Sequence, residues 1–109
     1  MANTFKLKTK ANVGVTTVGI YTAPASTTTV VIGITMAITS GSGVNVGVGI
    51  TRAGTTEDVK LLKNAPIPQG SSLEFMSGNK IVLEATDTVV VDSDTNNSVD
   101  ASLTIMEIT

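Results

Sequence analysis

The sequence predicts an all-β protein, a single-domain β-sandwich or jelly roll of about eight mostly antiparallel strands. Thr, Val and Ile, whose β-branched side chains fit a pleated sheet better than a helix, make up 41 of the 109 residues. Most segments alternate large apolar residues with small or polar ones, and clusters of Gly, Pro, Asn, Asp or Ser separate these segments. No segment has the apolar spacing of an amphipathic helix.

Four strands are expected in the first half of the chain. TFKLKTK (4–10) and VGVTTVGIYT (13–22) form the first two, and Pro24 ends the second because proline cannot donate to a strand ladder. The segments 28–39 and 44–51 each have a face of large apolar side chains, which we expect in the core. These faces contain Val30, Ile32, Ile34, Met36 and Ile38 in the first segment, and Val44, Val46, Val48 and Ile50 in the second. The turn SGSG between them predicts an antiparallel hairpin.

The second half of the chain alternates short strands with turns. RAGTTED (52–58) reads as a loop, VKLLKN (59–64) is ambiguous, and Pro66 and Pro68 predict an extended, poorly paired segment. Strands are expected at 73–76, 80–85, 88–91 and 99–108, with the turn SGN (77–79) between the first two. One face of the last strand contains Val99, Ala101, Leu103 and Ile105.

Length and charge indicate one domain with unlike ends. A chain of 109 residues forms one core, and we divide it into a basic N-terminal arm or edge strand at 1–12 and a β-sandwich domain at 13–109. The three lysines of TFKLKTK make the arm basic, whereas the last quarter of the chain has Asp and Glu as its charged residues. Either these charges lie on solvated faces of the first and last strands, or the arm reaches an acidic edge of a neighbouring copy.

The amino-acid composition argues against most kinds of catalytic and metal site. The chain has no histidine and no cysteine, which removes the usual general base, the usual ligands of zinc, copper and iron, and thiol nucleophiles. A single arginine and a net charge of -2 argue against nucleic acid, whose binders neutralise several phosphates. The sequence has no apolar run of roughly 18 residues and no signal-peptide pattern. We therefore expect a soluble, non-enzymatic protein without a cofactor that binds neither nucleic acid nor a membrane.

The segment DSDTNNSVDASL begins like the calcium loop of an EF-hand. It then departs from that pattern, because Asn97 stands where the loop needs glycine and Leu103 where it needs a bidentate glutamate. A polar turn between two strands is the favoured interpretation. Asp92, Asp94 and Asp100 remain weak candidates for calcium ligands.

The strand at 44–51 has a second face of small residues that includes Gly47 and Gly49. Such a face meets water or lets another backbone come close, as at a contact between subunits. The alternative is that the glycines permit a twist or a bulge. The sequence leaves both interpretations open.

Four segments carry a resemblance to known proteins: IYTAPASTTTVVIGITMAIT, LLKNAPIPQGSSLEF, GNKIVLEATDTVVV and ASLTIMEI. Their most specific elements are the Tyr21-Thr22-x-Pro24 opening, the Ile67-Pro68-x-Gly70 bend, the GNK turn before a strand that ends in Glu84 and Asp87, and the closing strand with Glu107. In this order, over residues 18–108, they resemble small β-rich virion structural proteins of tailed bacteriophages, particularly of marine and cyanobacterial phages.

The resemblance implies a virion protein made in the host cytoplasm, with a capsid decoration (cement) protein that self-associates and bridges capsid subunits as the first choice. Its partners are then copies of itself, with a trimer favoured, and the major capsid protein or other virion proteins. A neck, tail or fibre accessory protein is the alternative within this class, and a receptor- or carbohydrate-binding β-module is the alternative outside it. The candidate interaction residues are Phe5, Lys6, Leu7, Lys8, Lys10, Gly47 and Gly49.

Overall fold

Strands make up the regular structure of this protein, as the composition predicts. The structure is a computed structural model that describes residues 3–52, 58–75 and 80–109. In these residues the elements are β1 (Asn3–Val13), β2 (Val18–Thr22), β3 (Thr28–Ile38), β4 (Val44–Thr51), β5 (Asp58–Ile67), β6 (Ser72–Phe75), β7 (Ile81–Leu83), β8 (Thr88–Ser93) and β9 (Val99–Ile108). The described part of the chain contains no helix long and apolar enough to cross a membrane.

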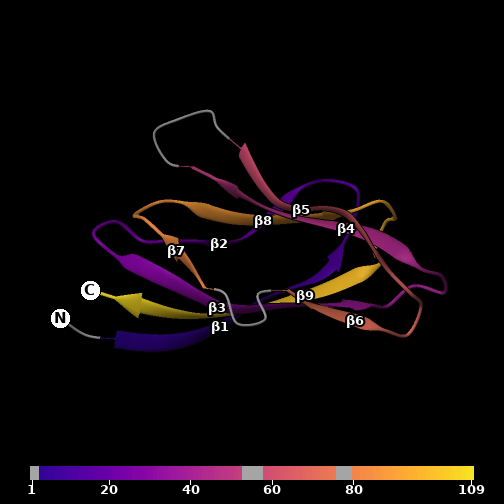
Figure 1. The fold of residues 1–109 in the computed structure, drawn as a ribbon, viewed down its shortest axis with the longest axis horizontal. Coiled ribbons are helices and arrows are strands. Elements are labelled where there is room, and N and C mark those ends of the chain that lie inside the picture. Colours follow the sequence, from indigo (N-terminus) through magenta and orange to yellow (C-terminus); the bar gives the residue numbers. More distant parts are fainter. Residues whose placement is uncertain (1–2, 53–57, 76–79) are drawn as a thin grey trace.

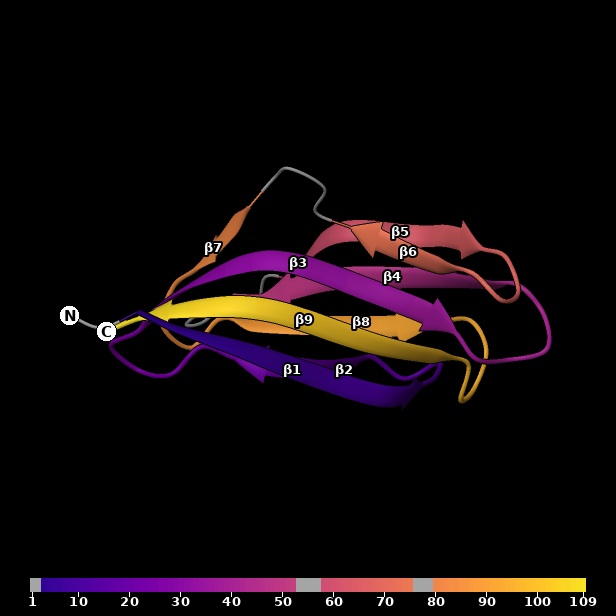
Figure 2. The ribbon, with the colours of Figure 1, turned by 90° about the horizontal axis from the view of Figure 1, so that it is seen from below.

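The strands form two sheets that pack face to face (Figures 1 and 2). The β1 sheet has the order β1-β9-β3-β6, with β7 also paired to β3, and the β2 sheet has the order β2-β8-β4-β5. All these pairs are antiparallel. The pairs β1–β9, β2–β8, β3–β6/β7 and β4–β5 are those of one long hairpin rolled into two layers, which is a jelly roll. The predicted fold class is confirmed.

The expected hairpin between 28–39 and 44–51 is wrong. β3 lies in the β1 sheet, where it pairs with β9, β6 and β7, whereas β4 lies in the β2 sheet between β8 and β5. The turn at 40–43 therefore carries the chain from one layer to the other. Alternation indicates the two faces of a strand but says nothing about its neighbours, and a Gly/Ser turn suits a crossing between layers as well as a hairpin.

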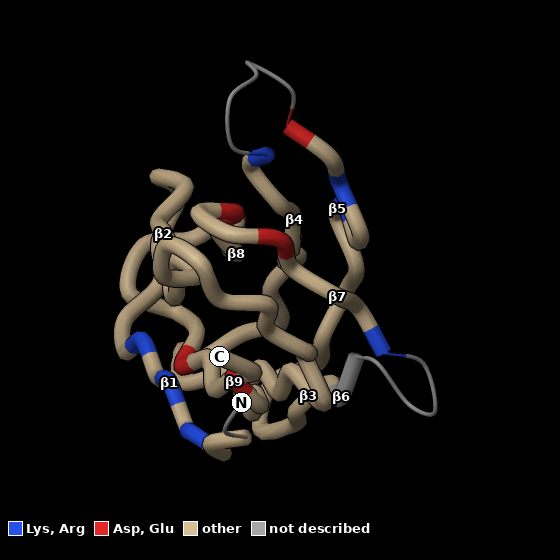
Figure 3. Tube along the Cα trace, turned by 90° about the vertical axis from the view of Figure 1, so that its left-hand side faces the viewer, with Lys and Arg blue, Asp and Glu red and all other residues tan. Residues whose placement is uncertain are grey.

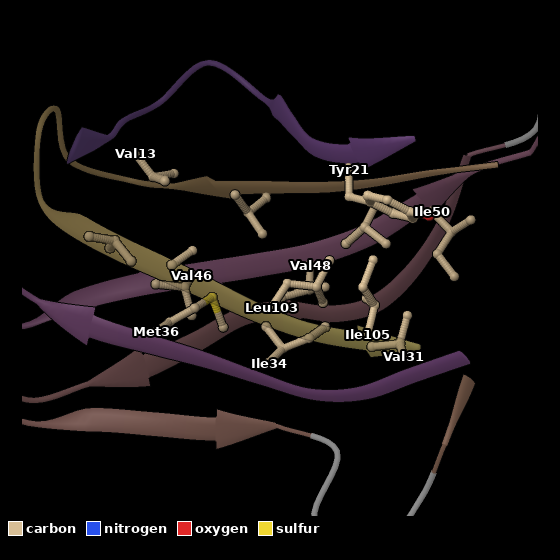
Figure 4. Close-up of a cluster of buried hydrophobic side chains, with 14 of the residues drawn as sticks. Val13, Tyr21, Val31, Ile34, Met36, Val46, Val48, Ile50, Leu103 and Ile105 are labelled. Carbon is tan, nitrogen blue, oxygen red and sulfur yellow. The ribbon is translucent and has the colours of Figure 1, made fainter. Parts of the chain in front are cut away.

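The core lies between the two sheets (Figure 4). The core faces expected for β4 and for the alternating set of β9 are confirmed, because every one of these side chains is buried. Buried side chains of the two sheets belong to one cluster, and Leu103, Ile34 and Val48 are among its members. This single cluster is why 109 residues suffice for a two-layer protein.

The core face predicted for β3 is right in its second half and wrong in its first. Ile34, Met36 and Ile38 are buried as expected, but upstream it is Val31 that is buried, while Val30 and Ile32 are half-buried. The register with β9 shifts between Val31 and Gly33, which leaves an extra residue in β3. Such a bulge reverses the facing of every residue on one side of it.

Two further differences lie in the connections. The expected strand 13–22 is divided, because β1 extends to Val13 and β2 begins at Val18. β5 runs through Pro66, which pairs with Asn45, although the prolines predicted poor pairing. β5 is an edge strand, where a proline without an N–H is tolerated. Most of the loop expected at 52–58 and the turn expected at 77–79 lie outside the described residues.

Candidate interaction surface

The edge strand β1 turns its lysines inward and its large apolar side chains outward. Lys6 lies opposite Ile105, and Lys8 opposite Leu103, both of them core residues of β9. Directly opposite residues of an antiparallel pair share a face, so the lysines point toward the β2 sheet. Phe5 and Leu7 alternate with them and are 68% and 65% exposed. In Figure 3 the basic residues of β1 follow one lateral edge of the sandwich.

Phe5 and Leu7 belong to an apolar group on the outer face of the β1 sheet. Phe5 lies opposite Met106, and Met106 and Val82 both lie opposite Val30. Val82 is exposed as well, whereas Val30 and Met106 are half-buried. We call this group of five residues the apolar end of the outer face, because it lies beside the start of β1 and the end of β9.

The other end of the same face is hollowed. A depression of about 310 Å³ lies over β1, β9 and β3. Its lining consists of Thr9, Lys10, Ala11, Thr35, Ala37, Asp100, Ala101 and Ser102. Ser102 pairs with Thr9 on one side and Thr35 on the other, so three short side chains form its floor. We call this depression the hollow.

A buried polar cluster joins the two sheets at the end where the chain termini lie. Tyr21 of β2 donates a hydrogen bond from its hydroxyl to Glu107 Oε2 of β9 at 2.6 Å. The same hydroxyl lies 2.8 Å from Thr29 Oγ1 of β3, and because its proton goes to Glu107, the threonine is the donor there. Lys6 Nζ completes the cluster with an ion pair to Glu107 Oε1 at 2.9 Å. The Lys8 ammonium lies 6.0 Å from the centre of the Tyr21 ring.

These contacts shift the ionisation of both acids. The hydrogen bond from Tyr21, and then that from Lys6, lower the pKa of Glu107 below its ordinary value. Burial, with the hydrogen bond to Glu107, raises the pKa of Tyr21 to about 12. Glu107 is therefore a carboxylate and Tyr21 a neutral phenol at neutral pH.

The charged ends of the chain thus meet within one molecule, through Lys6 and Glu107. Of the two interpretations that the charge asymmetry left open, neither included this contact. One signal for it was present in the sequence, because the alternation that places Ile105 inward also places Glu107 inward. A glutamate at a core position needs a partner, and Tyr21 supplies one.

The three aspartates of the calcium candidate each bind a different part of the chain. Asp92 accepts a hydrogen bond from Thr17 Oγ1 at 3.0 Å. Asp94 accepts one from the Asn45 N–H at 3.1 Å, and Asp100 one from the Asn12 N–H at 3.0 Å. Within the described ranges, no three acidic residues gather in a group that could hold a metal. The aspartates hold the connections at one end of the sandwich.

Gly47 and Gly49 are buried beneath β5 of the same chain. A Cβ on Gly49 would lie 2.8 Å from the Val59 carbonyl oxygen, and one on Gly47 would lie 2.5 Å from Asp92 Oδ1 of β8 and 3.3 Å from the Leu62 carbonyl oxygen of β5. The β4–β5 register shifts twice here, and each shift leaves an extra residue in β5. A bulged strand of the chain itself makes the close backbone approach that these glycines allow.

Replacing Gly49 with alanine is expected to lower the free energy of unfolding by about 1–3 kcal/mol, because the Val59 backbone must move to admit the methyl group. Gly41→Ala is the matched control, since a Cβ there meets nothing within 4 Å. Urea unfolding followed by circular dichroism measures both. If the two variants were equally stable, the Val59 carbonyl oxygen of β5 would not lie in close contact with position 49 of β4.

Comparison with known proteins finds no matching family model and no matching curated protein. Among solved structures, a chain of the acid-stable capsid of Helicobacter pylori bacteriophage KHP30 superimposes with a TM-score of 0.59 at 12% identity, over 100% of this chain and 89% of that one. A chain of the Bacillus endospore appendages, described as disulfide-linked pili, gives a TM-score of 0.57 at 16% identity, over 99% of this chain and 87% of that one. These comparisons show the fold.

Proposed function

We propose that this chain is a non-enzymatic structural subunit of a virion, and that it acts as a capsid decoration protein. The observation that carries the proposal is the exposed apolar end of the β1 sheet. Soluble monomers rarely expose contiguous apolar patches larger than a few hundred Å², and patches above that size mark sites of association. Phe5, Leu7 and Val82 are each more than half exposed and lie on one face, so this face suits burial against another protein.

The direction in which the lysine side chains of β1 point supports the same role. Lys6 and Lys8 point inward, to Glu107 and to the Tyr21 ring, so the outward positions beside Phe5 and Leu7 carry no lysine. In the folded chain these residues belong to the edge strand β1, which pairs with β9. The proposed contact with a capsid or with another copy is apolar.

The polar groups that the fold brings together support a structural role. The Tyr21–Glu107–Thr29 cluster links the two sheets, and its members hydrogen-bond to one another. The Tyr21 ring is buried, so it offers no platform on which a sugar could stack. Tyr21 therefore gives no support to the carbohydrate-binding alternative.

The two solved neighbours come from assembled particles, one a phage capsid and the other a pilus. The capsid likeness agrees with the virion role, although it does not distinguish tailed phages or cyanophages from others. The pilus likeness favours a second candidate, a subunit of a fibre or of a tail structure. This chain has no cysteine, so any fibre it forms is held together without the disulfides named for that pilus.

The proposal is tested by counting copies of the protein in purified virions of the phage that encodes it. Quantitative mass spectrometry compares its peptides with those of the major capsid protein. We expect the number of copies to match a component of the shell, with one copy for each major capsid protein or for each capsomer. A few copies per particle would place it in the neck, tail or fibres, and its absence from the particles would contradict the virion role.

A further inference from the structure

We infer that the outer face of the β1 sheet binds the same face of a second copy of this chain, in a two-fold pair that seats each apolar end in the partner's hollow. This inference rests on the proposed structural role and names the surface and the partner through which the subunit associates. Figure 2 looks onto this face, with β3, β9 and β1 side by side.

The protruding and the hollowed regions are displaced along the strands. Phe5 and Leu7 lie near the start of β1, whereas Ala11, at the hollow, lies near its end. Phe5 and Ala11 are six positions apart in β1, which at about 3.3 Å per residue is a distance of roughly 20 Å. The face therefore has large exposed side chains at one end and small side chains around a depression at the other.

A two-fold rotation brings these two regions together. When the axis lies in the plane of the face and crosses the strands, the second copy runs antiparallel to the first. Each apolar end then lies over the other copy's hollow, so one match is made twice, as an isologous interface requires. A three-fold ring needs two different surfaces on each subunit. The face consequently favours a pair over the trimer expected from the sequence.

The size of the face is adequate for a stable pair. β1 and β3 have 11 residues each, and the sheet is four strands wide. At about 3.3 Å per residue and about 4.8 Å per strand, the face covers roughly 700 Å². Two such faces bury roughly 1,400 Å², which lies within the standard size of specific protein interfaces.

The distribution of charge indicates that the second copy binds the outer face of the β1 sheet and not the free edge of β1. Inward-pointing charged side chains on an edge strand discourage other strands from pairing with it, and β1 has three. On the outward positions of β1 and β9 the sole charge is Asp100, whose carboxylate already accepts the Asn12 N–H. Along the outward positions of β1 and β9, two copies of this face therefore meet without like-charge repulsion.

Sedimentation velocity of the full chain tests the pair. At concentrations up to about 100 μM, where a micromolar complex is saturated, we expect twice the monomer mass of 11.1 kDa. Phe5→Ala and Ala37→Phe are each expected to weaken the pair about tenfold or more, the first by removing the protrusion and the second by filling the hollow. Val15→Ser, at an exposed apolar residue in the β1–β2 connection, is the control that leaves the mass unchanged.

A mixture of the two variants distinguishes this interface from any other. A Phe5→Ala copy keeps its hollow and an Ala37→Phe copy keeps its protrusion, so the mixed pair retains one native match and joins the filled hollow to the truncated end. We expect the mixture to dimerise more strongly than either variant alone. A monomeric wild-type protein, a dimer indifferent to Phe5→Ala, or a mixture no stronger than its components would overturn the inference. Because purified protein suffices, failure here is distinct from failure of the virion role, which virion copy number decides.

Discussion

Leu103→Ala is expected to lower the free energy of unfolding by about 3 kcal/mol, within the roughly 2–5 kcal/mol that removal of a buried leucine costs. Leu103 is fully buried in β9, the strand between β1 and β3 in the β1 sheet. It belongs to the cluster that joins the two layers (Figure 4). Its loss leaves a cavity that neither sheet can close without disturbing its own strand pairing.

The control is Thr104→Ala, one residue further along the same strand. Thr104 is exposed on the outer face, and its substitution should change stability by less than about 0.5 kcal/mol. Urea unfolding at neutral pH gives both values, and thermal unfolding should show Leu103→Ala melting at least about 10 °C lower. If Thr104→Ala were the more damaging of the two, the facing of β9 would be the reverse of that described.

The side chains of β4 and β9 that point into the core could be predicted, because inward and outward positions alternate without interruption along both strands. Their bulges lie in partner strands, in β5 beside β4 and in β3 and β1 beside β9, so the alternation in β4 and β9 is unbroken. β3 shows the opposite case. Its bulge near Ile32 lies beside Gly33, a residue that permits a bulge without requiring one, and the first part of its predicted face is reversed.

The candidate surface was less predictable than the core. Alternation in TFKLKTK separates Phe5 and Leu7 from the lysines but does not show which of the two sets faces the other sheet. The structure places them outside, because Lys6 and Lys8 find Glu107 and Tyr21 on the inner face. This choice depends on tertiary partners, Tyr21 at 13 residues from Lys8 and Glu107 at 101 residues from Lys6, and local alternation does not reveal them. The hollow likewise needs three strands that are distant in the sequence.

Tyr21→Phe is expected to destabilise the protein by about 1.5–3 kcal/mol at neutral pH, since hydrogen bonds to charged groups contribute about that much. The variant leaves the Glu107 carboxylate with Lys6 as its remaining partner in this cluster. It also removes the polar link between β2 and the β1 sheet. Urea unfolding at a series of pH values measures the difference in stability between the variant and the wild type.

That difference should shrink at both ends of the pH range. The folded-state pKa of Glu107 is lowered, so its contribution is present above its unfolded pKa of about 4.3 and is lost as the pH falls through the folded value. The pKa of Tyr21 is raised to about 12, so its contribution is present below the unfolded pKa of about 10 and is lost as the pH rises toward 12. Tyr21 is the single tyrosine, so absorbance of the phenolate reports its titration directly.

Two glutamate variants identify the carboxylate that causes the loss of stability at low pH. Glu107→Gln should flatten the loss of stability in acid, because the group whose pKa is lowered in the folded state is gone. Glu84→Gln is the matched control: its side chain is 74% exposed and pairs with Arg52 at the surface, where an ion pair is worth about 0–1 kcal/mol. The control should lose stability at low pH as the wild type does. If both variants lost stability in this way, the acid sensitivity would belong to other carboxylates, and the link between the sheets would rest on Tyr21 and Thr29 alone.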